Sequence, residues 1–216
     1  MKSLQDIEAI RKKTREELDL RVNLKASTRE KHILVCRGTG CTSSKSPVII
    51  DTFKKLIEEK GIQNVKVIQT GCFGLCAKGP IVIIRPEDVF YALVTPDDCE
   101  EIIQTHIVEG KLVERLLCRE IDNTIVKRLD ELNFYKKQQR IALKNCGIID
   151  PENIDEYIAF DGYKALEKCL FEMNPKQVIE EITSSRIKRK RRSRIPNREK
   201  MGIYSCSSRR PKICSM

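Results

Sequence analysis

Tryptophan is absent from this chain of 216 residues, aromatic residues make up 5% of it, and histidine occurs only twice. No run of apolar residues approaches the ~20 needed to cross a bilayer, so no membrane span is expected. The first six residues, Met1 to Asp6, lack the apolar core of a secretory signal peptide. We therefore expect a cytoplasmic protein, with a modest core built from the 40% of residues that are hydrophobic.

Cysteine, by contrast, is abundant, with ten residues. In a reducing cytoplasm this number points to metal or redox chemistry rather than to disulfides. Four of the ten form two close pairs, Cys36-Arg-Gly-Thr-Gly-Cys41 and Gly71-Cys72-Phe-Gly-Leu-Cys76. Each pair is short enough to lie on one loop, so two loops can present four thiolates to one centre. These four cysteines are the candidate metal ligands.

Four thiolates suit an iron–sulfur cluster or a structural zinc ion. The spacing of four and then three residues favours a [2Fe–2S] cluster, because two irons need a wider loop than one tetrahedral ion. A zinc-binding docking module without a redox role remains an alternative. A thioredoxin-like dithiol enzyme is disfavoured, since its redox pair needs Cys-x-x-Cys and the chain has none.

The two histidines and the remaining cysteines fit structural roles better than ligation. His32 opens a strand and His106 lies on a helix face, and no Cys-x-His pair of the Rieske type exists. Cys99 falls on the apolar face of a helix, so we expect it in the core. Three further cysteines have no partner at ligand spacing and are expected to be small, buried or half-buried residues: Cys118, Cys146 and Cys169.

Periodicity predicts a first helix over residues 3–21, with a thin apolar stripe of Leu4, Ile7 and Ile10. The elements predicted after it are a strand over 32–36, a helix from Ser46 as cap to Gly61, a strand over 65–71, strands over 81–84 and 89–94, and a helix from Thr95 to Gly110. The order β-α-β-β-β-α is a thioredoxin-like α/β arrangement. Both cysteine loops follow strand ends, where an α/β sheet places its sites.

The segment beyond the predicted α/β domain is harder to interpret. Residues 111–130 are polar and predicted to be a connector with helical tendency. Helical patterns follow in 132–147, 154–159 and 161–170, and from Asn174-Pro175 onward. They contain no complete core, so we expect residues 119–185 to be helical but loosely packed.

The net charge of +10 is concentrated at one end of the chain. Residues 186–216 hold twelve Lys or Arg and one acid, a net charge of +11, which leaves −1 for residues 1–185. The run from Lys188 to Arg194 could make salt-sensitive phosphate contacts. It lacks interleaved aromatic residues and a preceding folded platform, so no nucleic-acid partner is expected, and the tail is predicted to be disordered.

With these motifs in view, residues 30–118 resemble the thioredoxin-like [2Fe–2S] ferredoxin module of NAD-linked dehydrogenases and hydrogenases. Residues 132–185 resemble the opening of the flavoprotein (diaphorase) subunit of NAD(P)-reducing hydrogenase and of NADH:quinone oxidoreductase. The matching sequences there are Phe134-Tyr-Lys-Lys-Gln-Gln-Arg140, Asn145-Cys-Gly147, Tyr157-Ile-Ala159 and Gly162-Tyr-Lys-Ala-Leu166. The resemblance implies electron transfer through one [2Fe–2S] cluster, with other subunits of such a complex as partners.

The sequence departs from this family after Ser185. The family continues with a glycine-rich loop that cradles the FMN phosphate, where this chain has the basic stretch from Arg186. A DNA string that encodes Ile195 to Ile203, read one base later, encodes Phe-Pro-Thr-Gly-Lys-Lys-Trp-Glu, which matches that loop. We hypothesise that residues from about 186 are a frameshifted reading of it, which the parent DNA would test.

The sequence thus predicts an N-terminal helix (1–30), a thioredoxin-like [2Fe–2S] domain (31–118), a linker with an incomplete flavoprotein domain (119–185) and a basic tail (186–216). The resemblance places FMN and NAD(P) in the intact family member only. Without the FMN loop, this chain is not expected to turn over NADH alone, and no catalytic residue is assigned.

Overall fold

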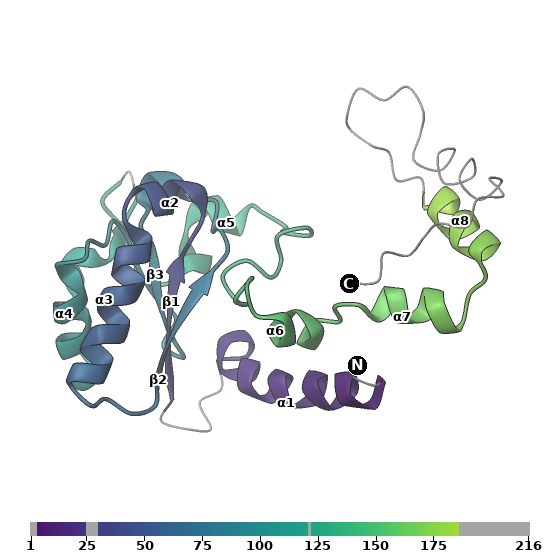
Figure 1. The fold of residues 1–216 in the computed structure, drawn as a ribbon. Helices are drawn as coiled ribbons and strands as arrows, with labels where there is room; N and C mark the ends of the chain where they lie inside the picture. Colours follow the sequence, from purple (N-terminus) through teal and green to yellow (C-terminus); the bar gives the residue numbers. More distant parts are fainter. Residues whose placement is uncertain (1–3, 25–29, 121, 186–216) are drawn as a thin grey trace. The chain divides into compact units, whose positions relative to one another are not determined.

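The computed structural model describes residues 4–24, 30–120 and 122–185 (Figure 1). The predicted basic tail lies outside these residues. The chain divides into two units, Met1–Phe160 and Asp161–Met216. None of the described helices is long and apolar enough to cross a membrane.

The first unit is built on a four-stranded sheet in the order β2-β1-β3-β4. β1 pairs in parallel with β2 and antiparallel with β3, which in turn pairs antiparallel with β4. The elements are α1 (Leu4–Val22), β1 (Lys31–Cys36), α2 (Thr39–Ser43), α3 (Ser46–Glu59), β2 (Val65–Thr70), β3 (Val82–Arg85), β4 (Val89–Tyr91) and α4 (Asp98–Glu101). The predicted order β-α-β-β-β-α is confirmed.

Side-chain alternation along β1 divides the core into two layers. Ile33 and Val35 pack with α3 and with the helical segment after α4. Leu34 and Cys36 face the opposite layer, which also contains Phe73. Cys118, the last residue of the predicted domain, and three side chains from beyond it complete the second layer: Val126, Leu129 and Leu132. Cys36 therefore lies on the sheet face that the later part of the chain covers.

Several boundaries differ from the sequence-based predictions. Ser46 is not the cap of α3, because Lys45 holds that position in the left-handed region and Ser46 is buried. The helix predicted from Thr95 begins at Asp98, whose carboxylate accepts the Thr95 N–H at 2.7 Å, and continues as a π-helical segment, Ile102–Val108. The extra turn α2 within the first cysteine loop was not predicted.

In the described part of the connector over 111–130, the helical segments are two short 3₁₀ turns, Glu114–Leu116 and Leu129–Glu131, so the predicted helical tendency is realised only there. It forms a small hairpin of β5 (Cys118–Arg119) and β6 (Ile125–Val126). Within 132–147 only α5 (Asn133–Lys136) is α-helical, and α6 (Ile154–Ala159) follows. Part of this stretch contributes to the second core layer through Val126, Leu129 and Leu132, whereas Ile141 and Leu143 are exposed.

The N-terminal helix packs only partly through the predicted stripe, of which Ile7 and Ile10 are half-buried. Leu4 is exposed, whereas the side chains of Leu18 and Leu20 are buried. The helix packs against α6, which lies far from it in the sequence (Figure 1). This neighbour belongs to the same unit.

The second unit, considered by itself, contains α7 (Lys164–Phe171) and α8 (Pro175–Ser184). Asn174 caps α8, since its side-chain oxygen accepts the Gln177 N–H at 3.0 Å. In turn, the Gln177 side-chain oxygen accepts the Asn174 N–H at 2.8 Å. Neither helix has a buried residue. These two helices match the expectation of a segment without a core.

Candidate metal centre

The two cysteine loops start at the same edge of the sheet. Cys36 is the last residue of β1 and lies in register with Thr70, the last residue of the parallel strand β2. Cys72 follows two residues later. Because parallel strands end at a common edge, the chain brings the two loops together there.

Three glycines make room for the sulfur atoms. A Cβ atom added at Gly38 would lie 3.0 Å from the Cys72 Sγ, and one at Gly40 would lie 3.3 Å from the Cys76 Sγ. A Cβ at Gly79 would lie 2.6 Å from the Cys41 Sγ. A side chain at Gly79 would force the Cys41 sulfur to move, and one at Gly38 or Gly40 would crowd the second loop, so glycine lets the loops approach this closely.

The four thiols interact as two pairs. Burial and then the neighbouring Cys36 thiol raise the pKa of Cys41 to about 12. The charge at Cys72 raises the pKa of Cys76. Weaker effects join the pairs, because Cys36 acts on Cys76 and Cys76 acts on Cys41. The four predicted ligands therefore lie near one another, with Cys36 beside Cys41 and Cys72 beside Cys76.

This arrangement does not form a compact mononuclear site. Within the described residues, no group of three or more His, Cys, Asp or Glu side chains is placed to hold a single metal ion. A structural zinc site needs four donors around one point, whereas a two-iron centre needs a separate pair of thiolates for each iron. The two loops bring four thiols to one edge of the sheet, the number of donors that either centre requires.

Exposure differs between the two pairs. Cys36 and Cys41 are 1% and 2% exposed, whereas Cys72 is half-buried and Cys76 is exposed. The Gly74 N–H donates to the Cys72 Sγ at 3.3 Å. The site is thus buried on the side of the first loop and reaches the surface at the second.

The histidines lie outside the site, as predicted from the sequence. His106 is buried, and its Nδ1 lies 2.7 Å from the Tyr91 hydroxyl. The Arg21 Nε donates to the Nδ1 of His32 at 3.0 Å. Burial lowers the pKa of both rings, that of His106 to about 4. Cys99 and Cys118 are buried in the core.

Cys146 is the residue near the centre that sequence reasoning missed. It is half-buried, and its Sγ lies 3.1 Å from the position of a Cβ added at Gly71. Burial raises its pKa, and the charges at Cys72 and Cys36 act in the same direction. Cys146 lies seventy residues after the second loop. This separation is far longer than the spacing within a cysteine pair, so no local sequence pattern identified it.

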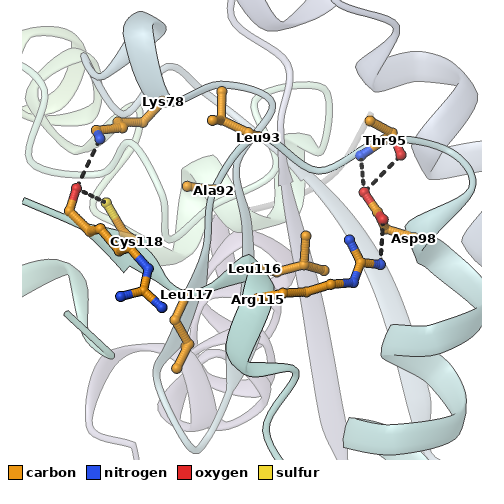
Figure 2. A pocket seen from close by; sticks show the side chains of 10 residues that line it. Lys78, Ala92, Leu93, Thr95, Asp98, Arg115, Leu116, Leu117 and Cys118 are labelled. Carbon is orange, nitrogen blue, oxygen red and sulfur yellow. Dashed lines mark hydrogen bonds and ion pairs between the residues drawn. The ribbon is translucent and has the colours of Figure 1, made fainter. Parts of the chain in front are cut away.

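A separate pocket of about 400 Å³ lies beside the turn that follows Cys76 (Figure 2). Lys78 lines it and donates to the Arg119 carbonyl at 2.9 Å. Asp98 lines it as well, and accepts bonds from Thr95 and Arg115. None of the four predicted ligands lines this pocket, so it is distinct from the metal centre.

Comparison with known proteins places the first part of the chain in a family. The family model for the thioredoxin-like [2Fe-2S] ferredoxin matches residues 22–106. A 2Fe-2S ferredoxin of Clostridium pasteurianum is 44% identical over 94 residues, which cover 39% of this chain and 92% of that protein.

Two further proteins are similar over the same region. The NADP-reducing hydrogenase subunit HndC of Solidesulfovibrio fructosivorans is 46% identical over 68 residues, or 32% of this chain and 14% of that subunit. The crystal structure of the wild-type thioredoxin-like [2Fe-2S] ferredoxin from Aquifex aeolicus is 28% identical, covers 43% of this chain and all of that one, and has a TM-score of 0.40. On the family model and the Clostridium relative, the chain belongs to the thioredoxin-like [2Fe–2S] ferredoxin family.

Proposed function

We propose that Cys36, Cys41, Cys72 and Cys76 hold the [2Fe–2S] cluster of this family and that the chain transfers electrons through it. The observation that carries the proposal is the joining of two thiol pairs at one sheet edge, with glycines that leave space for three of the sulfurs. The residues present therefore fit the group. When bound, the cluster supplies a one-electron carrier.

The protein's own residues determine how that carrier behaves. Thiolates from the first loop are buried and those from the second reach the surface, so the second loop is the side from which a partner approaches most closely. The Gly74 N–H bond to Cys72 stabilises negative charge on that sulfur, which makes the reduced state easier to reach.

We further propose that the chain acts as the N-terminal part of a flavoprotein subunit in an NAD(P)-linked hydrogenase or dehydrogenase, with other subunits of that complex as partners. The similarity to HndC supports this context. FMN and NAD(P) belong to the intact subunit in this proposal. Its location is the cytoplasm, where ligand thiols stay reduced.

Metal analysis with single substitutions tests the ligand assignment. Protein prepared without oxygen should contain about two irons and two sulfides per chain and give an EPR signal on reduction. Serine at any one of the four positions should remove or alter that signal. Cys169→Ser, on α7, is the control and should leave it unchanged. A colourless protein that contains zinc would support the docking-module alternative and contradict the proposal.

A further inference from the structure

Residues 133–149, here called the cover segment, lie against the second cysteine loop. The Tyr135 side chain packs in the core layer that contains Cys36 and Phe73. Its hydroxyl donates to the Phe73 carbonyl, next to Cys72. The family match ends at residue 106, so this contact comes from a later part of the chain.

A second attachment lies at the other end of the cover segment. Thr70, which ends β2 and is fully buried, accepts the Gly147 N–H at 2.9 Å and donates to the Ile149 carbonyl at 3.1 Å. Gly147 has a φ of +85° and lies directly on the Phe73 ring, which a Cβ at this position would overlap. The segment is therefore in close contact with the loop that holds Cys72.

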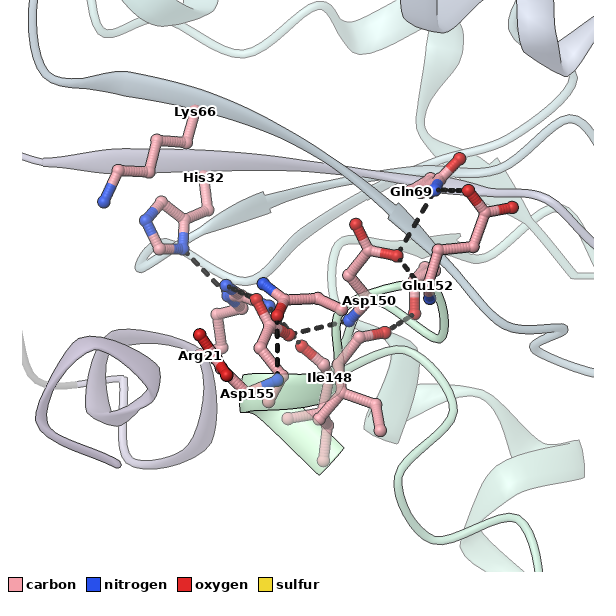
Figure 3. A network of polar contacts seen from close by, with 12 residues as sticks. Arg21, His32, Lys66, Gln69, Ile148, Asp150, Glu152 and Asp155 are labelled. Atoms are coloured by element: carbon pink, nitrogen blue, oxygen red, sulfur yellow. Dashed lines mark hydrogen bonds and ion pairs between the residues drawn. The ribbon is translucent and has the colours of Figure 1, made fainter. Parts of the chain in front are cut away.

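Between these ends, Arg140 contacts both Tyr135 and Cys146. The Arg140 guanidinium stacks over the Tyr135 ring at 5.0 Å and donates to the Cys146 carbonyl at 3.3 Å. Arg21 donates to the Ile148 carbonyl at 2.9 Å, which fastens the segment to α1 (Figure 3). The cover segment is thus attached to the domain at both ends, and Arg140 links the two ends to each other.

We infer that the cover segment forms one wall of the cluster pocket and keeps the reduction potential of the cluster low by excluding water from its Cys72 side. The inference rests on the proposed function. Reduction adds negative charge to a centre that four thiolates already make negative, and water stabilises added charge better than a buried apolar wall does. Tyr135 and Gly147 are positioning residues in this inference, since they act through Phe73 and the loop.

Gly147→Ala tests the inference in the full chain loaded with its cluster. The added methyl group overlaps the Phe73 ring and should lift the segment from the loop. We expect a more positive midpoint potential in an EPR-monitored redox titration and faster loss of iron to a chelator. Gly110→Ala is the matched control, because Gly110 also has a positive φ (+71°) but open space around it. It should keep both wild-type values.

Tyr135→Phe is the second variant, which keeps the ring and removes only the bond to the Phe73 carbonyl. We expect a smaller positive shift of the midpoint potential than in Gly147→Ala. If Gly147→Ala fails to fold, the Tyr135→Phe result alone tests the inference. Wild-type values of both midpoint potential and iron loss in the variants that fold would overturn the inference. A wild-type chain without a cluster signal would instead contradict the proposed function, so the two failures are distinguishable.

Discussion

The Arg21 guanidinium forms a two-pronged ion pair with the Glu156 carboxylate, with both N–O distances at 2.8 Å. The two side chains are only 4% and 6% exposed. Arg21 also donates to His32 on β1, and Glu156 accepts the Asp150 N–H at 2.7 Å (Figure 3). One buried network therefore joins α1, the sheet and the turn before α6.

Removal of one partner from this pair should destabilise the first unit strongly. We expect Arg21→Met to lower the free energy of unfolding by about 3–5 kcal/mol, because the Glu156 charge is left buried and unpaired. Denaturant unfolding followed by circular dichroism measures the effect. The double variant Arg21→Met with Glu156→Met should recover much of the loss. As a control, Lys55→Ala breaks an exposed pair with Glu59 and should cost less than about 0.5 kcal/mol.

Acid should destabilise the fold partly through His106. Burial, together with Lys31, lowers the pKa of His106 from 6.5 to about 4. The unfolded state then binds a proton at a higher pH than the folded state does, so stability falls as the pH decreases from 6.5 to 4. The loss attributable to this residue is of the order of 3 kcal/mol.

His106→Gln isolates this contribution from that of the other groups. Unfolding experiments between pH 4 and pH 7 should show a weaker pH dependence for the variant than for the wild type. Equal slopes for the two proteins would show that the His106 ring is protonated equally readily in the folded and unfolded states.

Substitution of Gly79 should interfere with cluster binding. A Cβ at this position would lie 2.6 Å from the Cys41 Sγ, so the sulfur has to move from the place where it is proposed to bind iron. We expect Gly79→Ala to lower the iron content, with an overpacking cost of about 1–3 kcal/mol. Iron and sulfide assays measure the result. Gly61→Ala serves as control, since nothing lies within 4 Å of its Cβ position, and full iron content in both variants would contradict the prediction.

The helix α7 exposes large apolar side chains that could pack against another protein molecule. Leu170 and Phe171 are both 68% exposed, which is costly in water and favours self-association. Replacement of both by Ser should reduce association in analytical ultracentrifugation while the EPR signal stays the same. A change of the EPR signal would show instead that α7 affects the cluster.

Local sequence patterns were sufficient for much of the fold and for the candidate ligands. A short apolar run identified β1, and the i, i+4, i+7 spacing identified α3, because these patterns depend on neighbours in the chain. The spacing from Cys36 to Cys41 and from Cys72 to Cys76 indicated a two-loop centre for the same reason. The helix start at Asn174-Pro175 was predicted from equally local residues.

What surrounds the centre depended on contacts between distant parts of the chain. No periodicity indicates that Tyr135 and Gly147 lie on the Phe73 loop, or that Arg21 pairs with a carboxylate 135 residues later. Such contacts depend on how the completed sheet presents its second face, and on which later side chains can cover it. The sequence alone determined the thiols and the order of the strands, whereas only the tertiary structure decided which residues enclose them, because burial and charge pairing over long range leave no local pattern.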